Sequence, residues 1–363
     1  MKVIVIGTRG IPNIMGGVET HCEELYPRLV DMGCDVTVVR RSCYITPDTD
    51  CNNYKGVKLH DIYAPRRKSL EAITHTFLAL LYARKANADI VHIHAIGPAL
   101  LVPFARLLGM KVVLTHHGPD YDRQKWGKLA KFILRTGEAW GVRCANKVIV
   151  ISKVIAEICS KKHNRHNTDL IYNGVNTPQR ATSDQYIRSL GLEPGKYILA
   201  TGRFVKEKGF DKLIEAYSRL SNCEYKLVIA GDADHPDDYS RQLKQQAHEN
   251  GVILTGFIRG EKLNEILSHA ALYVLPSSHE GLPIALLEAL SYNLDVTVSD
   301  IPANTLSCLT EEDFHKTSDV NSLTEALEKK ISQAPKHRQY DLSPYNWDNI
   351  ARQIKELYDT MLV

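Results

Sequence analysis

Four charged residues in the second half of the sequence have spacings that suit the binding of an anion and a sugar. Arg203 and Lys208 lie in the segment GRFVKEKG, directly after a β-rich run. Arginine can bind a phosphate through two parallel hydrogen bonds, and lysine acts on it as a point charge. Glu280 and Glu288 follow in EGLPIALLE, one expected in a loop and the other inside an apolar helix. A carboxylate in an apolar helix needs a polar partner, and the paired hydroxyls of a ribose would serve.

Two further segments supply groups that could act beside these charges. Pro283 suits the first turn of a helix, so the N–H groups of Gly281 and Leu282 should lie near a helix N-terminus, which favours negative charge. Phe257 and Ile258 follow another β-rich run and offer an apolar surface for a nucleotide base. Each segment alone could be an ordinary turn, and each charge a solvated or structural one. Only their combination predicts a phosphate-bearing ligand.

A long glycine-containing loop follows the first β-rich run. Gly16 and Gly17 precede a helical pattern in TRGIPNIMGGVET, and glycine lets backbone N–H groups approach an anion at a helix start. The loop matches neither the dinucleotide-binding GxGxxG nor the P-loop GxxxxGK[ST]. Arg40 and Arg41 end the second β-rich run, where a dinucleotide site would need an acidic residue for the ribose. The loop therefore indicates an anion and disfavours a nicotinamide cofactor.

Short β-rich runs alternate with helical patterns along the whole chain. Such alternation predicts parallel sheets with right-handed crossovers, and apolar runs such as VIVI suit strands buried on both faces. Strands are expected at residues 2–7, 35–40, 57–63, 89–94, 111–117, 147–152 and 169–172, and again at 196–202, 225–231, 252–256, 272–276 and 295–299. We therefore expect an α/β protein with two facing Rossmann-like, doubly wound domains, whose ligands bind at the carboxyl ends of the strands in an interdomain cleft.

The two expected domains meet where the polar stretch NTPQRATSD breaks the alternation, at residues 176–183. The N-terminal domain should comprise residues 1–176 and the C-terminal domain residues 177–344. A last amphipathic helix, within residues 345–363, lies beyond the end of the second domain. We expect this helix to return to the first domain.

Composition is that of an ordinary soluble globular protein. The 363 residues are 44% hydrophobic and 24% charged, which suits two domains. No signal peptide or membrane span is apparent, and the eight scattered cysteines are expected to be free thiols in a reducing cytoplasm. The net charge of +3 conceals an uneven distribution: residues 1–176 carry a net +10 and residues 177–363 a net −7.

Together, GRFVKEKG, the Glu-x7-Glu spacing of EGLPIALLE and the early GGVE loop resemble retaining glycosyltransferases of the GT-B fold, in glycosyltransferase family four. The resemblance extends over nearly the whole chain, and GTRGIPNIMGGVET is similar to a bacterial subgroup that builds surface polysaccharides. It implies transfer of a sugar from a nucleoside-diphosphate sugar, expected to be a UDP-sugar, to a glycan or polyprenyl-diphosphate-linked acceptor. Neither a metal nor another cofactor is expected, and the product would belong to capsule, O-antigen or exopolysaccharide biosynthesis.

In the second domain, the resemblance implies a role for each matching residue. Arg203 and Lys208 would hold the donor diphosphate, and Glu288 would bind the ribose hydroxyls. Glu280 and the backbone that follows it would hold the transferred sugar. The resemblance adds nothing for Phe257, which we still expect to contact the nucleotide base because its side chain is apolar.

In the first domain, the resemblance concerns the glycine loop and a histidine. Gly16 and Gly17 would close over the donor from the opposite domain. His117 in THHG occupies the usual cleft-histidine position and would contact the donor sugar near the reacting carbon, with His116 as the alternative. His117 is thus the first-domain member of the expected catalytic group, whose other members are Glu280, Arg203 and Lys208.

Three other functions remain open on the sequence. A sugar-nucleotide epimerase of similar two-domain fold would need no acceptor site. A nicotinamide oxidoreductase is disfavoured by the missing glycine fingerprint and by Arg40, and a non-catalytic binding protein by the complete charged set. Two metal-like patterns are expected to be decoys: the DxD of Asp232 and Asp234 at a strand end, and the pair His92 and His94 on one strand face.

The basic first half suggests an anionic partner. Its clusters could face anionic lipid or a lipid diphosphate, although solvated helix faces are the alternative. These clusters are Arg66-Arg67-Lys68, residues 125–131 with Trp126, and Lys161-Lys162. We expect a cytoplasmic protein that can lie at the inner face of the plasma membrane, and no nucleic-acid partner.

Overall fold

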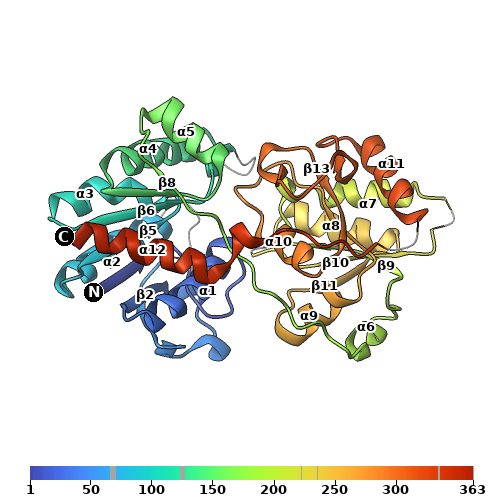
Figure 1. The fold of residues 1–363 in the computed structure, drawn as a ribbon, viewed down its shortest axis with the longest axis horizontal. Coiled ribbons are helices and arrows are strands. Elements are labelled where there is room, and N and C mark those ends of the chain that lie inside the picture. The colour runs from blue at the N-terminus through green and yellow to red at the C-terminus, as the bar shows by residue number, and fades with distance from the viewer. Residues whose placement is uncertain (66–70, 123–126, 222, 235, 334–335, 363) are drawn as a thin grey trace. The chain divides into compact units, whose positions relative to one another are not determined.

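The computed structural model describes residues 1–65, 71–122, 127–221, 223–234, 236–333 and 336–362. The chain forms two compact units (Figure 1). Unit 1 comprises Met1–Gly174 and Tyr345–Val363, and unit 2 comprises Val175–Pro344. The division thus falls two residues before the boundary expected from the sequence, and the chain returns to unit 1 at Tyr345.

Unit 1 is built on an eight-stranded sheet with the order β3-β4-β2-β1-β5-β6-β7-β8. Its strands are β1 (Lys2–Ile6), β2 (Asp35–Arg41), β3 (Asn53–Tyr54), β4 (Val57–Ile62), β5 (Ile90–His94), β6 (Val112–His116), β7 (Lys147–Val150) and β8 (Asp169–Leu170). β3 pairs antiparallel with β4, and the other neighbouring strands pair in parallel. The chain builds outward from β1 in one direction and then from β5 in the other. β1 and β5 therefore flank the point at which the strand order reverses, where doubly wound proteins bind ligands.

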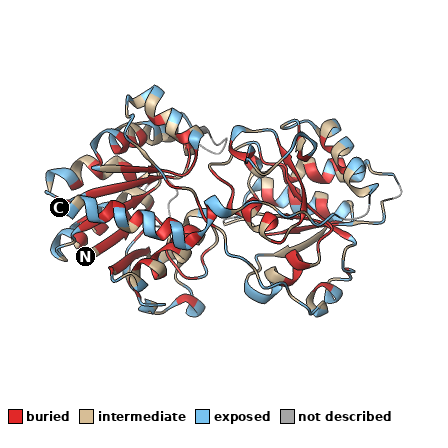
Figure 2. Ribbon diagram, in the orientation of Figure 1, coloured by how far each residue is buried: buried red, intermediate tan, exposed pale blue. Residues whose placement is uncertain are grey.

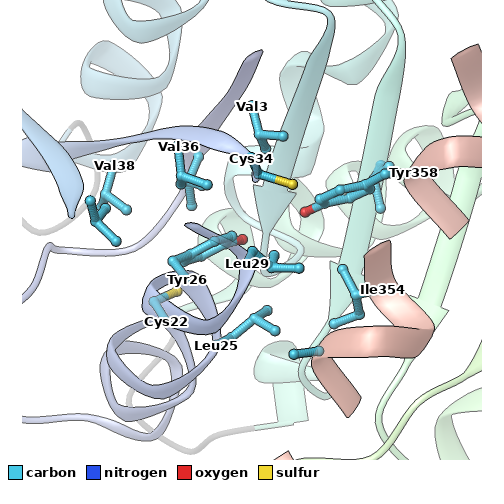
Figure 3. Close-up of a cluster of buried hydrophobic side chains, with 14 of the residues drawn as sticks. Val3, Cys22, Leu25, Tyr26, Leu29, Cys34, Val36, Val38, Ile354 and Tyr358 are labelled. Atoms are coloured by element: carbon cyan, nitrogen blue, oxygen red, sulfur yellow. The ribbon is translucent and has the colours of Figure 1, made fainter. Parts of the chain in front are cut away.

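The helices of unit 1 cover this sheet. They are α1 (Gly17–Asp31), α2 (Glu71–Lys85), α3 (Val102–Leu107), α4 (Lys128–Cys144), α5 (Lys153–His163) and the C-terminal α12 (Trp347–Leu362). α12 packs on α1, and its Ile354 and Tyr358 enter the same buried cluster as Leu25 and Leu29 (Figure 3). The last helix is therefore part of the unit 1 core.

Unit 2 repeats the architecture with a six-stranded sheet in the order β11-β10-β9-β12-β13-β14. Its strands are β9 (Tyr197–Thr201), β10 (Lys226–Ala230), β11 (Ile253–Gly256), β12 (Leu272–Leu275), β13 (Asp295–Ser299) and β14 (Phe314–His315). Its helices are α6 (Gln185–Ser189), α7 (Phe210–Ser218), α8 (Asp238–Glu249), α9 (Gly260–Ser268), α10 (Ile284–Ser291) and α11 (Val320–Ile331). Here β9 and β12 flank the reversal of strand order.

The central strands are buried along nearly their whole length, as parallel strands with helices on both faces must be (Figure 2). The predicted fold class, two Rossmann-like α/β domains, is confirmed. After β5 the chain forms two short helical pieces, a 3-10 turn, Pro98–Leu101, and then α3. Pro103 lies in the first turn of α3 and donates no backbone hydrogen bond, which suits a helix that starts anew there. No helix in the described ranges is long and apolar enough to cross a membrane.

Candidate functional site

The strongest site features of unit 2 lie at the carboxyl ends of β9 and β12. Lys208 ends a 3-10 turn, Lys206–Lys208, that follows β9, and Glu280 lies in the loop after β12. Because β9 and β12 are neighbours at the reversal of strand order, their following loops meet. Lys208 Nζ lies 2.6 Å from Glu280 Oε1, and the two side chains are only 17% and 12% exposed. The structure thus brings together the cation assigned to a phosphate and the carboxylate assigned to a sugar.

Glycine explains how the loop after β9 reaches β12. Gly209 adopts a left-handed conformation, with φ of 65°, and a Cβ there would lie 2.6 Å from the carbonyl oxygen of Pro276. The backbone N–H of Ser278 also donates to the carbonyl of Glu207, at 2.8 Å. These close backbone contacts fix the segment that carries Lys208 against the end of β12.

Arg203 has a partner that the sequence did not indicate. Its Nη1 lies 2.9 Å from Asp234 Oδ2, and both side chains are largely buried. Asp234 is the second carboxylate of the DxD pattern, and the first, Asp232, pairs with Lys244 at 2.8 Å. Both carboxylates of the pattern therefore have cationic side chains as partners. Asp234 positions Arg203 at the carboxyl end of β10, the strand beside β9.

A buried tyrosine connects the two glutamates electrostatically. Tyr273 in β12 is fully buried, and its hydroxyl forms a 2.9 Å hydrogen bond with Thr201 Oγ1. Burial raises the pKa of Tyr273, the hydrogen bond with Thr201 opposes this, and the charges of Glu288 and Glu280 raise it further. Both carboxylates therefore lie near the same point of the sheet edge.

Helix α10 carries Glu288 and presents its N-terminus in the same region. The sequence predicted Pro283 inside the first turn, whereas the structure places it at the N-cap position, with the helix beginning at Ile284. Among the described residues, no side chain caps this end. Its first-turn N–H groups and the backbone of Gly281 and Leu282 directly before them remain suited to an anion or a sugar hydroxyl.

Phe257 and Ile258 follow β11, the edge strand of the sheet. The Phe257 side chain is 44% exposed, and the guanidinium of Arg259 lies over its ring, 5.1 Å from the centroid. The ends of β10 and β11 are joined through the N–H of Gly231, which donates to Gly256 at 2.9 Å. The expected base-binding residues thus lie at the same edge of the sheet as Lys208, two strands away from β9.

The glycine loop of unit 1 is built around a buried carboxylate. Gly16 is the N-cap of α1 with φ of 149°, and a Cβ there would overlap the Glu19 carboxylate. Glu19 accepts hydrogen bonds from the Arg9 N–H, at 3.0 Å, and from the Thr8 hydroxyl, at 3.2 Å. A Cβ on Gly17 would meet nothing within 4 Å. The structure therefore requires glycine at position 16, whereas position 17 is free of such a constraint.

The two histidines of THHG face different surroundings. His116 is fully buried, and its Nε2 lies 2.9 Å from Glu138 Oε1. The other carboxylate oxygen of Glu138, Oε2, lies 2.8 Å from His163 Nε2. His117 is partly exposed, and its Nε2 lies 2.9 Å from His94 Nδ1. Burial, together with the neighbouring histidines, holds the pKa of His117 well below its usual value. His117 is therefore the neutral imidazole of the pair that a ligand can reach.

Sequence reasoning missed His21. It lies one turn into α1, in GGVETH, and its ring contacts that of His117 edge-to-face with centroids 5.1 Å apart. His92 and His94, which the sequence placed on one face of a strand, stack on each other with ring centroids 4.4 Å apart. His94 also stacks with His117, so the ring cluster is larger than the strand alternation indicated. A histidine at the start of a helix that follows a glycine loop was the available signal.

Known protein families match both units of the chain. Residues 15–179 match the family model "Glycosyltransferase Family 4", and residues 182–341 match "Glycosyl transferases group 1". An uncharacterized glycosyltransferase of Methanocaldococcus jannaschii is 26% identical over 99% of this chain and 98% of its own. The Escherichia coli UDP-Gal:α-D-GlcNAc-diphosphoundecaprenol α-1,3-galactosyltransferase is 28% identical over 77% of each chain.

Among solved structures, the Anabaena protein HepE in complex with UDP-glucose superposes with a TM-score of 0.81 at 17% identity. The match covers 99% of this chain and all of that one. At this identity the likeness concerns the fold, which is that of GT-B glycosyltransferases. The two family models are both of glycosyltransferases, and together they cover both units. The two relatives are also named as glycosyltransferases. The chain therefore belongs to the superfamily of glycosyltransferases with the GT-B fold.

Proposed function

We propose that this glycosyltransferase catalyses retaining, metal-independent transfer of a sugar from a UDP-sugar to a glycan or polyprenyl-diphosphate-linked acceptor in the synthesis of a cell-surface polysaccharide. The observation that carries the proposal is the pair of preorganised cations in unit 2. Lys208 and Arg203 lie at the carboxyl edge of the sheet, each held by a carboxylate, Glu280 or Asp234.

These cations match the charge that develops during the reaction. Breaking the bond between the sugar and the diphosphate leaves extra negative charge on the departing phosphate and an oxocarbenium-like sugar. Lys208, Arg203 and the N-terminus of α10 would stabilise that phosphate without needing a bridging metal. Because Asp234 already fixes Arg203, little reorganisation of that side chain is needed when the donor binds, whereas Lys208 would exchange Glu280 for the diphosphate.

The remaining residues of unit 2 would bind the rest of the donor. Glu288 would accept hydrogen bonds from the ribose hydroxyls, and Glu280 would bind the transferred sugar once the diphosphate engages Lys208. Phe257 and Ile258 would contact the base. For retention, we propose that the acceptor hydroxyl attacks the anomeric carbon on the face from which the diphosphate leaves, and that its proton passes to a departing phosphate oxygen.

Unit 1 contributes His117, Gly16 and Gly17 to the proposal through the family resemblance. His117 would contact the transferred sugar, and the two glycines would approach the donor. A UDP-sugar and a lipid-linked acceptor are supported by the names of relatives: the E. coli enzyme is named for UDP-Gal and a diphosphoundecaprenol, and the Anabaena structure contains UDP-glucose.

The basic surface of unit 1 supports an anionic membrane partner. In α4, Leu129 and Phe132 are 73% and 67% exposed, and Lys128 and Lys131 lie beside them in the helix. Apolar side chains flanked by lysines suit the interface of an anionic bilayer, which we propose to be the cytoplasmic face of the plasma membrane.

The other basic clusters carry less of this proposal. Lys161 pairs with Glu157, and Lys162 donates to the Tyr121 hydroxyl at 3.1 Å. The remaining predicted cluster residues lie outside the described ranges: Arg66, Arg67, Lys68, Lys125 and Trp126.

A thermal-shift panel of UDP-, GDP- and dTDP-sugars, followed by transfer to a polyprenyl-diphosphate-linked glycan in EDTA, tests the proposal. We expect a UDP-sugar to raise the melting temperature and the product to keep the anomeric configuration of the donor by NMR. An inverted product would overturn retention, and loss of transfer in EDTA would overturn metal independence. Isomerisation of the donor without an acceptor would instead support the epimerase, which the matched families do not favour.

A further inference from the structure

Three histidines of unit 1 gather beside the reversal point of its sheet. His94 ends β5, His117 follows β6, and His21 lies in α1. One ring nitrogen of each lies within 4.8 Å of the other two. His21 and His94 are buried, whereas His117 is partly exposed, so solvent can reach the group from the side of His117.

One of these nitrogens is left unsatisfied by the protein. His21 Nδ1 lies 3.0 Å from the amide oxygen of Asn173, which can only accept, so Nδ1 carries the ring proton. His21 Nε2 therefore bears a lone pair, and it is buried without a hydrogen-bond partner among the residues that the structure describes. Leaving a buried acceptor unpaired is unfavourable, and a bound cation would supply the missing partner.

The other two imidazoles can also present a lone pair while staying neutral. His94 Nδ1 and His117 Nε2 face each other at 2.9 Å and share one proton. His94 Nε2 is hydrogen-bonded to the Tyr26 hydroxyl, whose oxygen can accept a proton from that nitrogen. The Tyr26 hydroxyl proton can then turn toward His92 Nδ1, at 3.1 Å, a nitrogen that Tyr26 shares with the Tyr358 hydroxyl. The shared proton belongs to one of the two rings and can move to the other nitrogen of that ring. His94 Nδ1 and His117 Nε2 then both present a lone pair, and no proton leaves the protein.

We propose that His21, His94 and His117 form a binding site for one divalent transition-metal ion of the zinc class. Imidazole nitrogen suits zinc, nickel and copper, whereas magnesium and calcium prefer oxygen ligands. Asn173 and Tyr26 hold the outer nitrogens of His21 and His94, as outer-shell groups do for metal-bound histidines. Three protein ligands would leave a fourth position for water or a ligand atom.

Burial and ring packing prepare the ligands. His21 and His94 are buried, and the Nδ1–H of His21 donates to the amide oxygen of Asn173, which leaves Nε2 with a lone pair that can bind a metal. Trp347 contacts the His21 ring edge-to-face, with centroids 5.5 Å apart, and restrains its orientation. His92 is excluded as a ligand because Tyr358 and Thr115 occupy its two nitrogens.

This ion would inhibit the enzyme rather than assist it. The inhibition rests on the proposed function, which assigns His117 to the transferred sugar. Coordination would engage His117 Nε2 and put a charged ion directly beside the residue assigned to the sugar. Metal-independent transfer and a zinc-class site are therefore compatible, since transfer would proceed with the site empty.

Direct binding provides the first test. Untagged, metal-free protein is titrated with Co²⁺, followed by visible absorption, and with Zn²⁺ in competition with a chromophoric chelator. We expect one equivalent to bind, Zn²⁺ to raise the melting temperature, and the affinity to fall at least tenfold in His21→Gln and His94→Gln. His248→Ala, an exposed position in the last turn of α8, should bind like the wild type.

X-ray absorption of the zinc-loaded wild type keeps the test decisive if a variant does not fold. Two or three imidazole ligands support the site, and fewer than two overturn it. Unchanged binding in a folded His21→Gln protein, or no stoichiometric binding by the wild type at micromolar Zn²⁺, also overturns it.

Activity provides a separate test. We expect micromolar Zn²⁺, but not millimolar Mg²⁺, to inhibit transfer reversibly, with EDTA restoring it. Zinc binding without inhibition would overturn the inhibitory role while leaving the site intact. Absence of transfer in metal-free protein, with binding intact, would overturn the proposed function and not the site.

Discussion

Lys208 and Glu280 form a largely buried ion pair across the reversal point of the unit 2 sheet, with Nζ and Oε1 2.6 Å apart. Each comes from a loop that follows one of two neighbouring strands, β9 and β12. The pair holds the lysine in one place, and in the proposed function the carboxylate would exchange this partner for a sugar hydroxyl. A diphosphate that binds Lys208 would therefore release Glu280 toward the sugar at the same time.

Replacing Lys208 should remove transition-state stabilisation. Lys208→Ala is expected to lower the rate of transfer by about 10²–10³, as does the loss of one preorganised donor in other enzymes. Lys206→Ala alters an exposed lysine of the same 3-10 turn and should keep wild-type turnover. UDP release measures the rate, and circular dichroism checks the fold. Wild-type turnover in folded Lys208→Ala would remove Lys208 from the site.

The two aspartates of the DxD pattern should behave differently. Asp234→Asn is expected to weaken donor binding about tenfold, because the charge that orients Arg203 is lost. Asp232→Asn breaks only a half-exposed ion pair with Lys244 and should leave transfer unchanged. Titration calorimetry with the UDP-sugar, in EDTA and then in Mg²⁺, distinguishes the variants. If both lose activity and Mg²⁺ is required, the pattern is a metal site after all.

The sequence allowed the fold to be predicted well where periodic burial dominates. The short β-rich runs at β1, β5, β9 and β12 suit buried parallel strands, and each strand was expected within a few residues of its observed bounds. β3 and β14 were missed, because neither of these two-residue strands carries a periodic pattern. The position of β14 beside β13 depends on tertiary pairing alone.

The sequence allowed the charged residues of the candidate site to be predicted, but not how they pair. Loops that follow strands were recognisable, and so were Arg203 and Lys208 within them. Glu280 was also predicted as a site residue, but the ion pairs were not, because Asp234 lies 31 residues from Arg203 and Glu280 lies 72 from Lys208. Such pairs form only once the strand order is known, and strand–helix alternation does not specify that order. For the same reason the approach of His21 to His117 could not be inferred.

Acid should destabilise unit 1 through His75. This residue is fully buried in α2, and its Nε2–H donates to the carbonyl of Arg40 at 3.1 Å. Burial, with the nearby charge of Arg41, lowers its pKa from 6.5 to about 4 despite this hydrogen bond. Between these two values the unfolded chain binds the proton more tightly than the folded one, so stability falls as the pH drops below about 6.5.

His75→Gln retains an amide donor and removes the titration. Between pH 7 and pH 5 the wild type should lose about 2 kcal/mol more stability than this variant. Urea denaturation at the two pH values measures the difference, and His248→Gln, at an exposed position, should follow the wild type. Parallel pH curves for wild type and His75→Gln would contradict a buried neutral histidine.

Gly174 lies so close to Trp347 that a methyl group added at position 174 should weaken the packing of the C-terminal helix on unit 1. Both residues are buried, and a Cβ on Gly174 would overlap the indole of Trp347, at the start of α12. Gly174→Ala is therefore expected to destabilise unit 1 by about 1–3 kcal/mol. Gly127→Ala, where a Cβ meets nothing within 4 Å, should change stability by less than about 0.5 kcal/mol.

A double-mutant cycle separates this clash from a simple loss of backbone freedom. Trp347→Leu alone should be destabilising because it leaves a cavity beneath α12. In that background the added methyl group finds space, so Gly174→Ala should be less harmful there by about 0.5–3 kcal/mol. Urea denaturation followed by far-UV circular dichroism gives the four stabilities. Strictly additive effects would show that Gly174 is needed for its own conformation, and that the indole of Trp347 does not require glycine beside it.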